Sequence, residues 1–235
     1  MKKFSYLITE SKTLKDLPIK KVAILFTDVK DSSTLWSKSE DKMFESLSDL
    51  EDMMNSIIVE NNGMVVKTIG DSFMCSYESD EALFDSIKSA VIIQKHLNET
   101  PIKAGTNELR IRIGICYGDV YIRESKIQDV NLKDYFGNTV GSASRLESKV
   151  SEVGGFAFSF LENIDKKLEE DILKYLEDND IKIEVIEYDN KCDKESTRKR
   201  SARLLTDLQV NSCEDIIQLK GVNPLRVYKC ELKYK

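Results

Sequence analysis

Hydrophobic positions in the first half of the chain alternate between strand-like runs and helix-like spacing. Residues 21–29 form an apolar run that predicts a strand covered on both faces. Apolar positions at helical spacing follow from about Ser32 to the Asn-Gly pair at 62–63, and again from 80 to 99, where Pro101 ends the second predicted helix. Strands and helices are therefore expected to alternate from the start of the chain.

Further strand signals follow the first predicted helix. Residues 63–77 predict a β-hairpin, because two apolar runs flank an Ile-Gly-Asp turn. Residues 108–122 alternate apolar and polar positions as a strand does, and residues 134–150 predict a turn that leads into a helix. A short strand is expected after Gly154 and Gly155.

The C-terminal third of the chain is richer in charge. Residues 161–213 predict a helix at 161–176 and a strand at 181–187, and two strand-like runs close the chain. The element order β-α-β-β-α-β, with further strands, predicts an α+β sandwich of the ferredoxin-like or palm type, a mixed β-sheet with helices over one face. We expect an N-terminal leader at 1–20 and one domain at 21–235, with 161–213 as a charge-rich insertion.

Composition narrows the classes of function. The 235 residues are 41% hydrophobic and 32% charged, as in an ordinary globular protein. The net charge of −6 argues against nucleic acid as a partner, and the basic segment 194–203 is interpreted as a solvated surface. No apolar run approaches the roughly 20 residues of a membrane-spanning helix, and the N-terminus lacks the pattern of a secretory signal. We expect a cytoplasmic protein with no membrane partner.

The cysteines and the single histidine argue against several kinds of site. The five cysteines are widely spaced and lack a Cys-x-x-Cys pair, so they are expected to be reduced and indicate neither a disulfide framework nor a zinc site. His96 falls in the predicted helix at 80–99 and is expected at its surface. Triads that use histidine as the base are therefore disfavoured.

Two aspartates stand at the ends of strands that are predicted to be neighbours. Asp28 closes the strand at 21–29, and Asp71 lies in the turn of the hairpin at 63–77. If these strands share a sheet, both carboxylates emerge at one edge, where carboxylates, waters and substrate phosphates can bind Mg2+. Asp71 alone is also ordinary turn chemistry. Together the two aspartates indicate a magnesium site suited to phosphoryl chemistry.

Five segments, in order along the chain, resemble the catalytic domain of the class III nucleotidyl cyclases, the adenylate and guanylate cyclases. The segments are VAILFTDVKDSSTLW at 22–36, GMVVKTIGDSFM at 63–74, LRIRIGICYGDV at 109–120, DYFGNTVGSASRLES at 134–148 and LKGVNPLRVY at 219–228. The resemblance covers roughly residues 20–160 and 214–235. Each segment alone is weakly specific, whereas five in family order are strongly specific.

The resemblance implies a nucleoside triphosphate cyclase with two Mg2+ or Mn2+ ions per active site. Asp28 and Asp71, together with Val29, are implied to bind the metals from one subunit of a homodimer, and the partner subunit supplies the residues that contact the base and the transition state. Arg145 is implied to be the catalytic residue that grips the α-phosphate oxygens, and Lys220 is a candidate for binding the triphosphate. The expected products are a 3′,5′-cyclic nucleotide and pyrophosphate.

Lys67 and Asp134 match the positions at which the family reads the base. Lysine can donate to a ring nitrogen of adenine and aspartate can accept from its exocyclic amine, so ATP is the favoured substrate, and guanine is expected to need a different pattern. Cytosine presents the same order of hydrogen-bond donor and acceptor on its pairing edge, so CTP and UTP stay open as substrates. The first alternative is therefore a pyrimidine cyclase that produces a signal for antiphage defence. The second is a degenerate cyclase fold that binds nucleotide or regulates a partner.

Two positions depart from the family pattern. The family's catalytic helix usually carries an asparagine that orients the ribose, in a Val-Asn-x-Ala-x-Arg motif, and here Gly141 stands in its place. In the loop after Asp28, a family glycine is replaced by Asp31. Loss of the asparagine is expected to cost on the order of 10²-fold in rate unless another donor, Ser142 or Asn138, replaces it.

Overall fold

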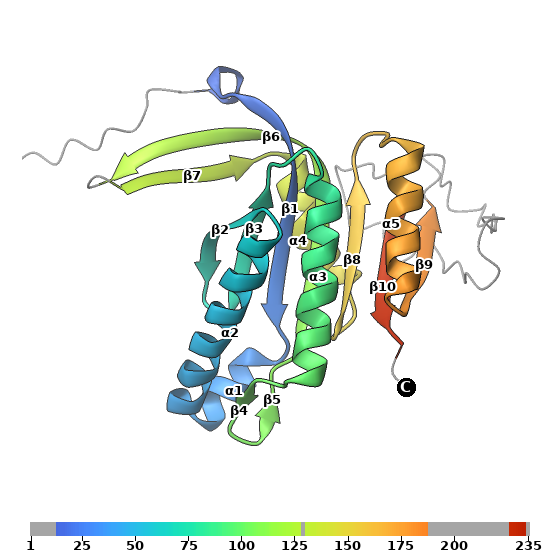
Figure 1. The fold of residues 1–235 in the computed structure, drawn as a ribbon. Coiled ribbons are helices and arrows are strands. Elements are labelled where there is room, and N and C mark those ends of the chain that lie inside the picture. Colours follow the sequence, from blue (N-terminus) through green and yellow to red (C-terminus); the bar gives the residue numbers. More distant parts are fainter. Residues whose placement is uncertain (1–12, 128–129, 188–225, 234–235) are drawn as a thin grey trace, which may run out of the picture.

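The computed structural model describes residues 13–127, 130–187 and 226–233, and its centre is a mixed β-sheet with helices on both faces (Figure 1). The strands of the main sheet are β1 (Ile19–Val29), β2 (Gly63–Ile69), β3 (Ser72–Tyr77), β6 (Ile111–Ile127), β7 (Val130–Phe136), β8 (Gly155–Phe160), β9 (Ile181–Glu187) and β10 (Arg226–Leu232), and a small separate sheet pairs β4 (Lys103–Ala104) with β5 (Asn107–Glu108). The helices are α1 (Ser32–Lys38), α2 (Glu40–Glu60), α3 (Ala82–Glu99), α4 (Asn138–Lys149) and α5 (Lys166–Asp178), preceded by a 3-10 turn at Leu14–Asp16.

The strand order of the main sheet is β2-β3-β1-β6-β8-β10-β9. Neighbouring strands run antiparallel, except that β6 and β8 are parallel. β6 continues past its pairing with β1 and forms a hairpin with β7 that extends beyond the body of the sheet (Figure 1). The predicted α+β fold with a mixed sheet is confirmed.

The side chains of β1 alternate between two hydrophobic clusters, one on each face of the sheet. Ala23 and Leu25 face the larger cluster under α2, α3 and α5, whereas Val22 and Ile24 face a second cluster that includes Ala143 of α4. All of these β1 side chains are fully buried. The expectation that helices cover only one face is therefore wrong. An uninterrupted apolar strand needs cover on both faces, and α4 with β7 supplies the second layer.

Gly114 of β6 allows α4 to lie directly against the sheet. A Cβ atom at this position would lie 2.1 Å from the backbone nitrogen of Glu147 and 2.3 Å from the carbonyl oxygen of Ala143, far inside van der Waals contact. The backbones of strand and helix therefore meet with no side chain between them. This contact sets the position of α4, which carries the predicted catalytic residue Arg145.

Some predicted boundaries differ from the structure. The helix expected from Ser32 onward is divided into α1 and α2 at Ser39, which is extended (φ −166°) and whose side chain accepts a hydrogen bond from the backbone N–H of Lys42. Asp134 lies in strand β7, where a turn was expected. The helix and strand expected within the charge-rich segment are α5 and β9, and β1 begins at Ile19, inside the expected leader.

Other expectations concern individual residues. His96 is exposed on α3, as predicted, and Cys75, Cys116 and Cys230 are buried free thiols. The other two cysteines and the basic segment lie outside the described residues. None of the helices in the described part of the chain has both the length and the apolar composition needed to cross a membrane.

Two glycine-to-alanine changes test the contact between β6 and α4. Gly114→Ala should lower the free energy of unfolding by about 1–3 kcal/mol or more, because the new methyl group collides with the helix backbone. Gly141→Ala is the matched control within α4, since a Cβ there meets nothing within 4 Å, and it should raise stability by about 0.5–1 kcal/mol. Urea unfolding of both variants measures the difference. Equal effects of the same sign would contradict the close approach.

Candidate active site

Asp28 and Asp71 meet at one end of the sheet, as the sequence predicts. Asp28 is at the end of β1, and Asp71 lies in the β2–β3 turn, where Gly70 adopts a positive φ of 63°. The backbone N–H of Val29 donates to Oδ2 of Asp71 (3.3 Å), and Ser72 Oγ donates to Oδ1 of Asp28 (2.9 Å). These bonds tie the hairpin turn to the end of β1, so the tight turn is what places Asp71 beside the residue that follows Asp28.

The oxygen atoms at this end suit a hard divalent cation. Mg2+ and Mn2+ prefer carboxylate, carbonyl and water oxygens. Within the described ranges, no group of three or more Asp, Glu, His or Cys side chains gathers at one point. Asp28 and Asp71 would therefore leave the other positions around a metal to water, backbone carbonyls and substrate phosphates. Val29 is 2% exposed and apolar, so it could contribute only its backbone carbonyl.

Arg112 and Glu147 also belong to this end of the sheet, and the sequence reasoning missed both. Arg112 is the cross-strand partner of Asp28, and its guanidinium donates to Oδ2 of Asp28 at 2.7 Å. Its Nε lies 3.2 Å from Oε1 of Glu147, an ion pair without hydrogen-bond geometry. One signal for this pair was present in the sequence. Arg112 stands two residues before Gly114 on β6, so its side chain lies on the face of the strand against which α4 packs.

Burial raises the pKa of Glu147 to about 7, and the negative charge of Asp28 adds to this effect while Arg112 partly offsets it. The Glu147 side chain on α4 is only 9% exposed. One guanidinium thus pairs with two carboxylates, Asp28 and Glu147, and burial makes Glu147 hold its proton more tightly than an ordinary glutamate does. The charge at this end of the sheet is therefore sensitive to pH near neutrality.

The predicted base-reading residues, Lys67 and Asp134, are in direct contact. Lys67 Nζ donates to Oδ1 of Asp134 at 2.9 Å, and the two side chains are 41% and 26% exposed. The register between β2 and β3 shifts between Val65 and Lys67, which marks a β-bulge. Bulges re-aim the side chains that follow them. The bulge therefore contributes to the direction of Lys67, and β7 brings Asp134 to it.

The residues on either side of Asp134 anchor β7 to the body of the sheet. Lys133 and the hydroxyl of Tyr135 both donate to Glu78, which follows β3, and Ser76 Oγ donates to the Tyr135 hydroxyl at 3.0 Å. Burial opposes ionisation of Glu78, but its hydrogen bonds, including one from Lys20, outweigh burial and lower its pKa to about 2. This ionised carboxylate holds β7 in place on both sides of Asp134.

Arg145 and Gly141 lie on one face of α4, because they are four residues apart. Arg145 is half-buried and, within the described residues, makes no hydrogen bond or ion pair. A pairing with Glu147, the ordinary alternative for a helix-surface arginine, is not found, since residues two apart do not face each other and Glu147 pairs with Arg112. Arg145 is therefore available to a ligand.

Asp31 keeps the backbone conformation that a glycine would favour. Its φ is 56° and its ψ is 30°, in the left-handed region, where aspartate is among the better tolerated residues. Its carboxylate lies 3.1 Å from Nζ of Lys30, so a cation accompanies the added negative charge. The substitution therefore preserves the course of the loop after β1.

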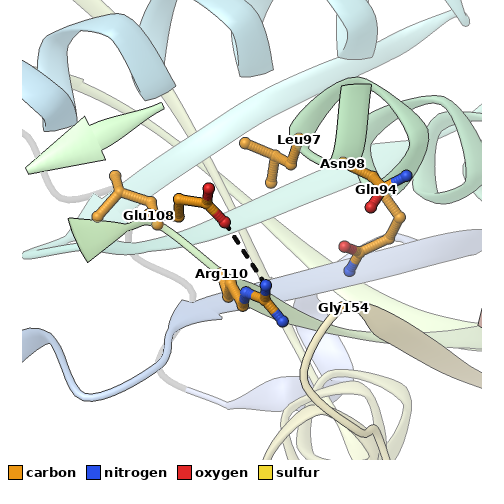
Figure 2. Close-up of a pocket in the computed structure, with 7 residues that line it drawn as sticks. Gln94, Leu97, Asn98, Glu108, Arg110 and Gly154 are labelled. Atoms are coloured by element: carbon orange, nitrogen blue, oxygen red, sulfur yellow. Dashed lines mark hydrogen bonds and ion pairs between the residues drawn. The ribbon is translucent and has the colours of Figure 1, made fainter. Parts of the chain in front are cut away.

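Lys220 lies outside the described residues. A pocket lies between α3 and the start of β6, where Arg110 pairs with Glu108 at 3.5 Å (Figure 2). Its lining residues are Gln94, Leu97, Asn98, Glu108, Leu109, Arg110 and Gly154. None of the predicted site residues lines this pocket, so it has no part in the site.

Comparison with known protein families identifies the family of the chain. Residues 14–155 match the family model described as the adenylate and guanylate cyclase catalytic domain. This match covers more than half of the chain, so the chain belongs to the class III nucleotidyl cyclase family. A curated relative, receptor-type adenylate cyclase GRESAG 4.3 of Trypanosoma brucei brucei, is 25% identical over an alignment of 166 residues, and the match covers 56% of this chain and 13% of the relative. The chain thus matches only a small part of that protein's length.

Solved structures show the same fold with different nucleotides. The catalytic core of a rhodopsin-guanylyl cyclase with converted specificity, in complex with ATPalphaS, has a TM-score of 0.62 and 18% identity, over 93% of this chain and 99% of that chain. The guanylate cyclase domain of RhGC from Catenaria anguillulae, in complex with GTP, has a TM-score of 0.61 and 17% identity, over 92% of this chain and 100% of that chain. The fold alone therefore does not decide the base.

The raised pKa of Glu147 predicts a stability difference that depends on pH. A carboxyl group whose pKa is higher in the folded state than in the unfolded chain stabilises the fold below about pH 4.5, and this contribution disappears as the pH rises through about 7. The free energy of unfolding of the wild type, relative to Glu147→Gln, should therefore decrease between pH 5 and pH 8. Urea unfolding at each pH without divalent ions measures it. Parallel pH profiles for the two proteins would contradict the assignment.

Proposed function

We propose that the protein converts ATP to 3′,5′-cyclic AMP and pyrophosphate at two composite sites of a homodimer. The observation that carries the proposal is the contact between Lys67 and Asp134, two residues 67 positions apart that different strands bring to 2.9 Å. An exposed ion pair contributes little to stability, so stability alone is a weak reason for it. Arg145, which has no partner among the residues that the structure describes, and the two aspartates at one end of the sheet support the same function.

Asp28 and Asp71 are the residues that would hold the metals, with water and substrate phosphates completing the coordination. Two divalent ions, when bound, would neutralise charge on the triphosphate and favour ionisation of the attacking 3′-hydroxyl. Arg145 is always charged, and its planar guanidinium would donate to the oxygens of the α-phosphate as charge develops there. Positioning and charge neutralisation of this kind need no histidine base, in keeping with the exposed position of His96 on α3.

The homodimer follows from the division of labour that the family resemblance implies. The metal-binding aspartates of one chain would face the Lys67, Asp134 and Arg145 of its partner, so each dimer would contain two sites. A single chain that carries both sets can complete a site only with a second copy. Each site is therefore proposed to span the two subunits.

The identity of the base rests on Lys67 and Asp134. In the proposed complex, Lys67 donates to N1 of adenine and Asp134 accepts from the N6 amine. The adenylate cyclase names of several relatives support the same substrate. Because the fold is also found with GTP, the two side chains and not the fold carry this part of the proposal.

Complementation between inactive variants tests the composite site. Asp71→Ala and Arg145→Ala should each abolish turnover as homodimers. Co-expression should restore about a quarter of the wild-type activity, because half of the dimers are mixed and each has one intact site. A coupled assay for pyrophosphate with ATP and Mn2+ measures this recovery.

The control for this experiment co-expresses two variants that each lack one of the metal-binding aspartates. Asp28→Ala and Asp71→Ala, when co-expressed, should give no recovery, since every site then lacks a metal-binding aspartate. Recovery in this control, or none in the first pair although mixed dimers form, would rule out the proposed division between subunits.

Gly141 offers a test that increases activity. An asparagine side chain fits there because a Cβ meets nothing within 4 Å, and it would lie one helical turn before Arg145. Gly141→Asn should raise kcat by up to on the order of 10²-fold with ATP, since it restores a donor that orients the ribose. Gly141→Ala controls for helix stability and should leave kcat near the wild-type value. An asparagine variant no faster than the alanine variant would show that the position does not contact the ribose.

A further inference from the structure

Arg123 lies beside the contact between Lys67 and Asp134, and neither the motifs nor the proposed mechanism uses it. It is on the part of β6 that extends beyond β1, and it is the direct cross-strand partner of Asp134 on β7. Directly paired residues on antiparallel strands present their side chains on the same face. Arg123 is therefore placed to act together with Asp134.

The carboxylate of Asp134 lies between two cations, one at each oxygen. Lys67 Nζ is 2.9 Å from Oδ1, and a terminal nitrogen of Arg123 is 3.7 Å from Oδ2. The Arg123 distance is that of an ion pair and too long for a hydrogen bond, so the N–H groups of the guanidinium keep donor capacity for a ligand. Lys67, Asp134 and Arg123 together present a hydrogen-bond donor, an acceptor and a donor, in that order.

The guanidinium of Arg123 is held in place by an aromatic ring. Its central carbon lies 4.7 Å from the centroid of Phe136, two residues after Asp134 on β7. Such cation–π stacking restricts a side chain that is otherwise 47% exposed. The orientation of Arg123 therefore depends on the same hairpin that carries Asp134.

We propose that Arg123 is a third base-reading residue, which donates to N7 of adenine while Lys67 donates to N1 and Asp134 accepts from the N6 amine. The inference rests on the proposed function and deepens its choice of substrate. Along its N1, N6 and N7 edge, adenine offers acceptor, donor and acceptor, the complement of this arrangement. Cytosine matches at only two of the three positions, and guanine along the same edge matches only at N7, because its N1–H is a donor and its O6 is an acceptor. Uracil matches all three through O4, N3 and O2, so the experiment separates it from adenine.

The test compares ATP with 7-deaza-ATP, which lacks only the N7 acceptor. For the wild type, kcat/KM should be on the order of 10-fold higher with ATP, as expected for one hydrogen bond from a charged donor. Arg123→Leu should lower kcat/KM for ATP by a similar factor and bring the ratio between the two substrates to about 1. A purely structural role of Arg123 would lower both substrates equally and leave the ratio unchanged.

Arg110→Leu is the matched control, because Arg110 is an exposed arginine that pairs with Glu108 away from Asp134. Its ratio of ATP to 7-deaza-ATP should equal that of the wild type. An unchanged ratio in Arg123→Leu would overturn the proposal, and so would turnover of UTP without turnover of ATP. If no triphosphate yields a cyclic product, the proposed function fails, and the same ratio measured from dissociation constants still decides whether Arg123 contacts N7.

Discussion

The candidate site depends on the direct contact between the backbones of β6 and α4 at Gly114. Any larger residue there would push the helix off the sheet, since a Cβ would lie 2.1 Å from the backbone of Glu147. The close approach places Glu147 beside Arg112, and the same helix carries Gly141 and Arg145, which share one of its faces because they are four residues apart. The packing of a single helix therefore connects the residues of the metal end with the proposed catalytic arginine.

The second constraint is the charge balance around Asp28. Its carboxylate accepts from Ser72 and Arg112, and Arg112 also pairs with the buried Glu147. A divalent cation bound to Asp28 would compete with Arg112 for the same carboxylate. The guanidinium of Arg112 would then be free to pair with other anionic groups nearby. Phosphate oxygens would be such groups. The raised pKa of Glu147 favours its neutral form at low pH, which leaves Arg112 to Asp28 alone.

The sequence allowed much of the fold and the meeting of Asp28 with Asp71 to be predicted, because these features follow from local patterns. An apolar strand, a tight turn and helical spacing each specify their own element, and adjacent antiparallel strands then fix the strand ends. Strand β7 was missed because Asp134 stands among residues that read equally well as a turn before α4. The pairing of Arg112 with Glu147 was missed because it depends on how closely α4 approaches β6, which no local pattern records.

Asp134 shows why the base-reading side of the site needs tertiary structure. Lys133 and Tyr135, on one side of β7, bind the ionised Glu78 and fasten the strand. Alternation along a strand directs the intervening side chain, Asp134, the other way. The same anchoring that stabilises the hairpin thus keeps Asp134 available to Lys67 and Arg123, and each of these cations comes from a different strand. Recognition of the base would then depend on how the β6–β7 hairpin is attached to the sheet. Residues that never touch the nucleotide, such as Glu78, would affect base recognition by setting the position of β7.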